Sequence, residues 1–487
     1  MMGRDPGRQE KLFITNFTLE SRVRKDHVLR KVAATIDFDF IYDEVKDSYG
    51  NNGNVSVPPA VILKMLLLLV LYNVRSEREL MATIPERLDW LWFLGYDLES
   101  EVPHHSVLSK ARTRWGVTAF KHFFERIVYQ CMEAGLVDGK KLFVDASLID
   151  ADASNNSVVD IKNLKERLSK GYKHLEERLD QIQDKKRTPC DSRYISGTDP
   201  DASVIRRGSG KSKPRYKTHR GVDPANEVIT ATQVTPGAVD DAHVLQDLIA
   251  KHEQNTQQEV QTLVADSKYG TMENYLDCHD RDINAHMPSL EKVRRGSGSQ
   301  KGIFPKEAFI YEPDTDTFLC PAGHRLYRRG RNRKKHFHLY KTSRGLCAAC
   351  ELRDQCTRAK KGRVLKRHER QHDIDLMVER AETLKAKRDI KTRQHLSERS
   401  FARSTRYGYK RARWRRLWRM QIQDYLIAAV QNIITLTTRS SRKLSKSNAL
   451  KKARPWGAAL DLRGFMVPSR EILTRFVGYM RQSFARI

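Results

Sequence analysis

The chain has 487 residues and carries 89 Lys and Arg against 60 Asp and Glu, which gives a formal net charge of +29. A charge of this size favours a polyanionic partner over a merely soluble basic protein. Hydrophobic residues make up 39% of the chain, enough for real cores, so global disorder is excluded. The length allows roughly two to four domains of about 100–200 residues each.

Residues 1–135 have the pattern of a helical, polar-edged region. Its most apolar stretch, residues 60–71, follows two prolines and is interrupted by Lys64. This stretch is too short to span a bilayer, so it predicts a buried helix. Ser76 followed by Glu79 predicts the start of the next helix, because the serine can cap it and the glutamate can complete the capping box.

Two further helices are expected at 106–115 and 120–132, and the first has a basic side. A helical bundle with basic edges suits the binding of DNA ends, although a plain scaffold bundle explains it equally well. The first residues contain no apolar segment typical of a secretory signal, so a cytoplasmic location is expected.

Two apolar segments each end in a lone acid. Residues 140–146 include Asp145, and residues 260–265 run directly into Asp266. A carboxylate at a strand end is held at a sheet edge, and two or three brought together can hold divalent metal ions for phosphoryl transfer. Beside a basic surface, the expected substrate is a nucleic-acid phosphodiester. The sequence therefore predicts a metal-dependent enzyme that cuts or joins DNA.

The segments around these two strands predict a mixed α/β sheet. Apolar residues that recur every seven positions predict a helical arm or short coiled coil at about 158–187, and residues 188–214 have the composition of a loop. The remaining expected elements are a hairpin at 215–221 and 227–235, a helix at 240–251, a short helix at 272–279 and a strand at 283–287. In this order, the two acid-ended strands could lie side by side.

Residues 290–370 interrupt the pattern with dense Gly, Lys and Arg and a cluster of cysteines. The clustered cysteines are Cys320, Cys347, Cys350 and Cys356. They could form a tetrahedral zinc site with His324 as an alternate ligand, or they could be simple reduced thiols. The isolated cysteines, expected to be structural, are Cys131, Cys190 and Cys278.

The C-terminal third begins with a charged helix expected at 378–394 and continues with an amphipathic helix expected at 420–437. Between them, Arg399 to Met420 contain nine Arg or Lys and no Asp or Glu, interleaved with aromatic residues. This run is a candidate phosphate-binding surface, and its aromatic side chains could stack on bases or pack in the core. The last fifty residues are basic and less regular.

Several short segments occur in a characteristic order along the chain. They are PPAVILKMLLLLVLYNVRSEREL, VPHHSVLSKAR, FVDASLIDADAS, GTDPDA, YKTHRGVD, VTPGAVDD, LVADSKYG and RQHLSERSFA. Together they resemble bacterial insertion-sequence transposases with an Asp-Asp-Glu (DDE) triad, and most closely the branch with a cysteine-bearing insertion before the Glu. The resemblance covers roughly residues 15–437.

The resemblance implies an α/β fold with a ribonuclease H-like mixed-sheet catalytic core. It places Asp145 at the end of the first strand, Asp266 after the fourth and Glu398 on a late helix. These three would hold two magnesium ions for cleavage at element ends and joining to target DNA, with a homodimer on paired double-stranded DNA ends. Three rival acids are expected to be solvated or capping groups: Asp150, Asp152 and Asp241.

The resemblance also implies a division of the chain. The expected parts are a DNA-binding helical domain at 1–135, the first part of the catalytic core at 136–289, a cysteine-containing insertion at 290–370, the remainder of the core at 371–437 and a basic tail at 438–487. The residues expected to bind DNA are Arg399, Arg403, Arg406, Lys410, Arg411, Arg413 and Arg415.

Three positions depart from the family pattern. The family usually has Lys at Thr405, Gly at Arg416 and often Tyr at Lys391. Since the family's Lys contacts DNA at the element end, its role here would pass to neighbouring basic residues. Two alternative functions stay open: a decayed copy that acts as a DNA-binding repressor, and a free-standing DNA nuclease without strand transfer.

Overall fold

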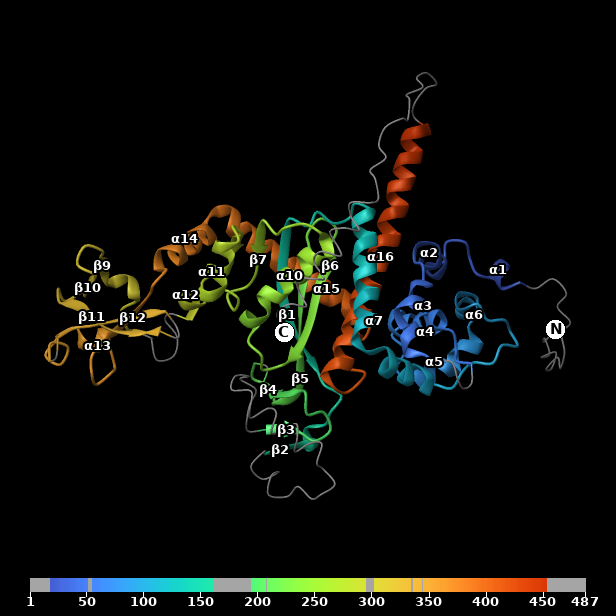
Figure 1. Ribbon diagram of the computed structural model, residues 1–487, viewed down its shortest axis with the longest axis horizontal. Coiled ribbons are helices and arrows are strands. Elements are labelled where there is room, and N and C mark those ends of the chain that lie inside the picture. The colour runs from blue at the N-terminus through green and yellow to red at the C-terminus, as the bar shows by residue number, and fades with distance from the viewer. Residues whose placement is uncertain are drawn as a thin grey trace, which may run out of the picture. The chain divides into compact units, whose positions relative to one another are not determined.

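The computed structural model describes residues 18–50, 55–160, 194–206, 208–294, 302–333, 336–343 and 345–452, with side chains up to residue 439 (Figure 1). Most of the predicted arm at about 158–187, Cys190 and most of the predicted basic tail therefore lie outside the described residues, and the described start of the arm, residues 158–160, is a strand rather than a helix. The chain divides into two units, Met1–Arg439 and Ser440–Ile487. The site described below lies in the first.

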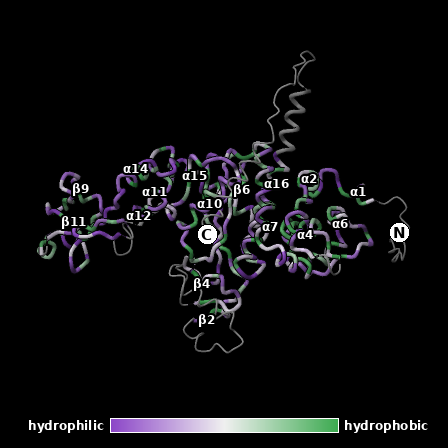
Figure 2. The backbone as a smooth tube through the Cα atoms, viewed as in Figure 1, coloured by the Kyte–Doolittle hydropathy of each residue, from purple (hydrophilic) through white to green (hydrophobic). Residues whose placement is uncertain are grey.

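Helices form the described chain up to residue 134. They are α1 (Leu19–Arg22), α2 (Val28–Thr35), α3 (Phe40–Val45), α4 (Pro59–Leu71), α5 (Glu77–Thr83), α6 (Leu88–Leu94) and α7 (Ser106–Glu133), with 3-10 turns at Lys46–Ser48 and Ile84–Glu86. The predicted buried helix is confirmed as α4, most of whose residues are apolar and buried; it lies in the hydrophobic region around its label in Figure 2. None of the described helices is both long and apolar enough to cross a membrane.

Two local signals in this region are confirmed. Ser76 caps α5, and its hydroxyl accepts a hydrogen bond from the Glu79 N–H at 3.1 Å. The two helices predicted at 106–115 and 120–132 are the two halves of α7, which kinks at Gly116. Gly116 has φ of 65°, a conformation that glycine adopts without the steric cost of a side chain.

The central sheet carries the candidate site. Its main strands are β1 (Lys141–Asp150), β5 (Lys213–Asp223), β6 (Val228–Pro236), β7 (Thr262–Val264) and β8 (Asn284–His286). They lie in the order β6-β5-β1-β7-β8, where β1, β5 and β6 are antiparallel and β7 and β8 run parallel to β1. Three antiparallel strands, a helix and two parallel strands are the ribonuclease H-like arrangement, so the predicted fold class is confirmed. The predicted pairing of the acid-ended strands is confirmed too.

The two faces of this sheet are covered by different helices. Phe143 and Val222 belong to the core shared with α7, α15 (Leu384–Thr405) and α16 (Leu417–Lys452). Leu142 and Val144 point to the other face, where they pack with α10 (Leu245–Thr256), α11 (Met272–Asp280) and α14 (Gln371–Glu382). The alternation along β1 therefore decides which residues face α15.

Two predicted elements of this core have the wrong boundaries. The polar residues after Ala146 do not end the strand, because β1 continues to Asp150 through pairing with Arg215–Lys217 of β5. The single helix predicted at 378–394 is two helices. Thr383 separates α14 from α15 and caps α15 by accepting the Ala386 N–H at 3.3 Å.

The segment predicted as a loop at 188–214 contains short strands in its described part. The sheet extends beyond β5 through β2 (Val158–Asp160), β3 (Tyr194–Ser196) and β4 (Ser203–Ile205), and a 3-10 turn at Asn155–Ser157 precedes β2. A single-residue bridge and short ladders form here despite a loop-like composition, because the first three residues of β5 extend beyond β6 and pair with β4.

The insertion forms a small antiparallel sheet that the sequence pattern did not predict. Its strands, in the order β13-β12-β11-β10-β9, are β9 (Ile310–Glu312), β10 (Thr317–Leu319), β11 (Arg325–Asn332), β12 (Phe337–Lys341) and β13 (Val364–His368). Its short helices are α12 (Leu290–Arg294), α13 (Arg353–Cys356) and a 3-10 turn at Lys306–Ala308. Its buried core has five residues: Phe309, Phe318, Leu326, Tyr340 and Leu365.

Candidate active site

Asp145 and Asp266 occupy matching positions on neighbouring parallel strands. Phe143 of β1 pairs with Val264 of β7, and each aspartate lies two residues further along its strand direction. Because side chains alternate, both carboxylates point to the face that α15 covers. Neighbouring strands are about 4.8 Å apart, so the two acids form a close pair at the point where β7 ends beside the middle of β1.

The Asp145 carboxylate is held by its own strand and by α15. Its Oδ1 accepts the Ala146 N–H at 2.8 Å, and its Oδ2 lies 2.9 Å from Nη1 of Arg393 in an ion pair. Ser397, one turn after Arg393 on the buried face of α15, acts in the same direction as Arg393 by lowering the pKa of this carboxyl. Burial raises the pKa of Asp145, the Arg393 charge opposes this rise, and the neighbouring charge of Asp266 adds to it.

Asp266 is fixed in a tight turn. Its Oδ1 accepts the Lys268 N–H at 2.9 Å, and the turn closes through the Tyr269 N–H. The negative charge of Asp266 adds to the rise in the pKa of Asp145, and a divalent cation bound between the two carboxylates would relieve this repulsion. This hard-oxygen pair therefore fits a magnesium ion.

Glu398 lies on the helix that covers the pair, but on its exposed side. Arg393, Ser397 and Ser404 form the buried face of α15. Glu398 is exposed and accepts a 3.4 Å hydrogen bond from Gln394. Within the described chain, no three His, Cys, Asp or Glu side chains are gathered closely enough to hold a metal ion. The structure brings the two aspartates together but not Glu398, and the catalytic role of all three residues stays a prediction.

The three rival acids are all engaged in ion pairs. Asp241 is buried, with Oδ1 2.6 Å from the Lys217 Nζ and Oδ2 3.4 Å from the Lys268 Nζ. Asp150 pairs with Arg215 at 2.8 Å. Asp152 pairs with Arg411 and Arg415, at 3.1 and 3.3 Å. Each of these acids already neutralises a basic side chain.

The predicted DNA-binding residues divide into three groups. Arg399 and Arg403 are ion-paired to Glu227, and Arg411 and Arg415 to Asp152, all near the surface. The side chains of Arg406 and Lys410 are exposed and have no acidic partner among the described residues. Arg413 is different, since its guanidinium turns inward.

Arg413 joins this segment to the turn that follows α4. It donates to the Val74 carbonyl and to the Asn73 side chain. Its guanidinium is therefore not part of the proposed DNA surface. The aromatic residues of the run pack in the core or against it, as the alternative interpretation holds: Tyr407, Tyr409, Trp414 and Trp418.

One departure from the family pattern has a structural meaning. Arg416, where the family usually has glycine, has φ of 85°. This left-handed conformation favours glycine, so an arginine here carries backbone strain. The GTDPDA segment compensates: Asp199 accepts the Arg416 N–H at 3.0 Å, and Asp201 accepts the Leu417 N–H at 2.9 Å. These two carboxylates hold the start of α16.

The four clustered cysteines are free, half-buried and line one small cavity together with His324. The Cys320 sulfur accepts the His324 N–H at 3.2 Å, and the Cys347 sulfur lies 3.1 Å from the Thr342 hydroxyl. Burial raises the pKa of Cys356, and the other three thiols add to this rise against Arg363. The described isolated cysteines, Cys131 and Cys278, are buried in the cores.

The residues that sequence reasoning missed are those on the buried face of α15. Arg393, Ser397, Ser400 and Ser404 recur at helical spacing, and this periodicity was the available signal. This periodicity did not lead to a prediction of burial, because the four residues are polar and a polar stripe on a helix usually faces solvent.

Two family models match the chain. Residues 17–114 match one described as "Transposase domain (DUF772)", and residues 319–437 match one described as "Transposase DDE domain". No curated protein matches the chain. Among solved structures, it is similar to a piggyBac transposase synaptic complex with hairpin DNA, at 8% identity and a TM-score of 0.34, covering 86% of this chain and 74% of that chain.

Proposed function

We propose that this chain, which is an insertion-sequence transposase of the DDE type, cleaves DNA at element ends and joins those ends to target DNA by two-metal-ion phosphoryl transfer. The observation that carries the proposal is the placement of Asp145 and Asp266. They lie at matching positions of adjacent strands in a ribonuclease H-like sheet, under the helix that bears Glu398.

The residues proposed to hold two magnesium ions are Asp145, Asp266 and Glu398. When bound, such ions activate a nucleophile and stabilise a leaving oxygen. In cleavage, a water oxygen bonds to phosphorus and the 3′-oxygen leaves with a proton. In joining, that 3′-hydroxyl attacks a target phosphodiester and displaces another 3′-oxygen. No protein nucleophile is required, while Arg393 and Ser397 orient Asp145.

A strand-transfer assay tests this function. Purified protein, magnesium and duplexes bearing the element ends should yield cut ends and then products joined to a target plasmid. Cleavage without joined products, even when pre-cut 3′-hydroxyl ends are supplied, would favour the nuclease alternative. Specific binding without any cleavage would favour the repressor alternative.

We propose that the exposed basic side chains after Glu398 bind DNA phosphates, with Arg406 and Lys410 foremost. Arg399, Arg403, Arg411 and Arg415 form ion pairs at the surface that DNA can compete for. A protein that neutralises phosphates releases counterions, so its affinity falls steeply with salt.

Replacing Arg406 and Lys410 with Ala should lower the slope of log affinity against log salt by about one for each phosphate that the protein no longer neutralises. Fluorescence anisotropy with labelled element ends between low and physiological salt measures this slope. Arg281→Ala is the matched control, because Arg281 pairs with Glu253 on the opposite face of the sheet and should leave the slope unchanged. An unchanged slope in the double variant would exclude these two residues from the surface.

We also propose that Cys320, Cys347, Cys350 and Cys356 bind one structural zinc ion. The support is their position around one cavity and the small five-residue core of the insertion. Residues 345–363 contain three of the thiols and only one short helix, so a metal would order a segment that has little apolar surface to bury. Binding requires the thiol side chains to turn toward a common point.

Freshly reduced protein should carry about one zinc per chain by elemental analysis. Replacing Cys347 and Cys350 with Ser should release it and speed hydrogen exchange in residues 302–368, while β1 keeps its protection. Cys278→Ala is the control, since this buried thiol lies in another core. If freshly reduced wild-type protein contains no zinc, the zinc proposal is wrong and the four cysteines are simple reduced thiols.

The division of the chain at about 135, 289, 370 and 437, the homodimer on paired DNA ends and a cytoplasmic location in a bacterium are also proposals. Analytical ultracentrifugation of the protein with and without duplex element ends tests the dimer. A single chain on each pair of ends would exclude it.

A further inference from the structure

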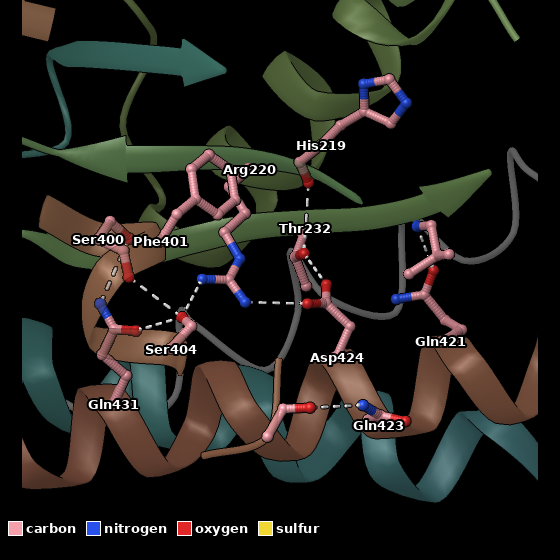
Figure 3. Close-up of polar contacts among 12 residues, drawn as sticks. His219, Arg220, Thr232, Ser400, Phe401, Ser404, Gln421, Gln423, Asp424 and Gln431 are labelled. Carbon is pink, nitrogen blue, oxygen red and sulfur yellow. Dashed lines mark hydrogen bonds and ion pairs between the residues drawn. The ribbon is translucent and has the colours of Figure 1, made fainter. Parts of the chain in front are cut away.

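A buried arginine lies beside the candidate active site, but its side chain donates hydrogen bonds to residues of two helices and not to the two aspartates. Arg220 of β5 is the register partner of Asp145, so the two side chains leave the sheet on the same face, under α15. Arg220 is 1% exposed. Its Nη1 donates to the Ser404 hydroxyl at 2.5 Å and its Nη2 to Asp424 at 2.9 Å. Figure 3 shows this reach from the sheet to two different helices.

The two residues that accept hydrogen bonds from Arg220 are themselves part of a buried polar network. The Ser404 hydroxyl can donate to the side-chain oxygen of Gln431, at 2.8 Å, or to the backbone carbonyl of Ser400, at 3.1 Å. Thr232 of β6 donates to the second Asp424 oxygen. Ser404 and Asp424 are fully buried. The network therefore joins β5 and β6 to α15 and α16 in the protein interior.

The helix α15 is attached to the sheet on both sides of Glu398: Arg220 of β5 contacts it after Glu398, and its own Arg393 pairs with Asp145 of β1 before Glu398. The Arg220 guanidinium lies 5.2 Å from the centre of the Phe401 ring, next to its bond with Ser404. Arg393 pairs with Asp145 one and a half turns before Glu398. The two attachments span about 16 Å of helix at 1.5 Å per residue. They fix the position of the segment that contains Glu398 along β1.

The directional polar contacts of Arg220 can fix the position of α15 on the sheet more closely than apolar contacts could. An apolar interface tolerates sliding and rotation of a helix, whereas a guanidinium fork accepts only one arrangement of its partners. Asp424 also neutralises Arg220, so this cation does not compete for Asp145. Since a misplacement of about 1 Å can cost roughly 10²-fold in rate, such a clamp has a functional use.

We propose that Arg220, through Ser404 and Asp424, is a positioning residue that holds the Glu398 helix in register with Asp145 and Asp266. The inference rests on the proposed function. It assigns a role to a buried ion pair that lies outside the proposed metal ligands and the proposed DNA surface.

Two substitutions test the role without removing the buried charge. Arg220→Lys keeps the cation for Asp424 but cannot also reach Ser404 with a fork, and Ser404→Ala removes one partner only. Each should lower kcat for cleavage about 10²-fold with unchanged affinity for DNA. Each should also raise about tenfold the Mn²⁺ concentration for half-saturation, measured without DNA from the electron paramagnetic resonance signal of free Mn²⁺.

Asn432→Ala is the matched control. Asn432 anchors α16 to β6 through two side-chain hydrogen bonds with the Ile229 backbone, at 2.9 and 2.8 Å, rather than to α15. It should lower the melting temperature like Ser404→Ala but leave kcat and Mn²⁺ binding unchanged. The positioning role is overturned if Arg220→Lys and Ser404→Ala behave like this control.

Glu398→Gln separates that outcome from a failure of the proposed function. This variant keeps the whole network. If it binds Mn²⁺ and cleaves like wild type, the proposed triad is wrong. If it loses both while Ser404→Ala keeps both, the triad stands and only the positioning role is overturned.

Discussion

Asp145→Asn, Asp266→Asn and Glu398→Gln should each abolish DNA cleavage while leaving DNA binding largely intact. Each change removes one proposed metal ligand with almost no change in side-chain shape. We expect a loss of at least about 10³-fold in single-turnover rate, equivalent to about 4 kcal/mol of transition-state stabilisation. The rate is measured with end-labelled duplexes in magnesium, and binding is measured separately by anisotropy.

Asp150→Asn is the control for this series. Asp150 ends the same strand as Asp145 and is paired with Arg215, so it tests whether any carboxylate on β1 has the same effect. It should cleave close to the wild-type rate. Any one of the three main variants that cleaves at the wild-type rate is thereby excluded from the triad.

Glu77→Ala should cost about 3–5 kcal/mol of unfolding free energy, because it leaves a buried charge without a partner. Arg112 of α7 is 3% exposed, pairs with Glu77 of α5 and lies 3.9 Å from the centre of the Trp414 ring. Trp414 in turn donates to Glu77 at 3.1 Å. The pair therefore links two N-terminal helices to the segment between α15 and α16.

Denaturant unfolding followed by tryptophan fluorescence measures this loss, which is a large share of the roughly 5–15 kcal/mol typical of a domain. Glu125→Ala is the comparison, since Glu125 pairs with Lys121 one turn earlier on a more exposed part of α7, at 3.2 Å. It should cost about 0.3–0.5 kcal/mol. Equal effects of the two substitutions would show that the buried pair contributes no more than a surface pair.

Features set by neighbouring residues could be predicted from the sequence. The apolar run after Pro58 gives α4, the Ser76 cap gives α5, and the amphipathic spacing of Ile422, Tyr425 and Leu426 gives the buried face of α16. The existence of β1 and β7, but not their ends, follows from the apolar segments before Asp145 and Asp266. In each case the signal extends over a few turns or one strand.

Features set by distant partners could not be predicted in this way. The polar end of β1 is a strand only because β5 supplies its hydrogen bonds. Arg413 reads as a DNA contact until the turn after α4 provides its acceptors. Arg220 lies in the predicted hairpin, and no neighbouring residue indicates its burial, because its partners Ser404 and Asp424 lie about two hundred residues later. Glu398 could be selected as a candidate catalytic residue only from the resemblance to the transposase family.

The covering of β1 by α15 has a consequence for how the chain is made. α15 begins at Leu384, 234 residues after β1 ends at Asp150. At about 5–20 residues per second, a ribosome needs roughly 10 to 50 s to synthesise that interval. Once β5 and β6 have been made within this interval they can pair with β1, but Phe143, Ile149 and Val222 still have no helix of the C-terminal part over them until α15 and α16 follow. The nascent sheet therefore exposes an apolar face that invites aggregation, and its yield in cells should depend on chaperones that bind such a face until the C-terminal helices emerge.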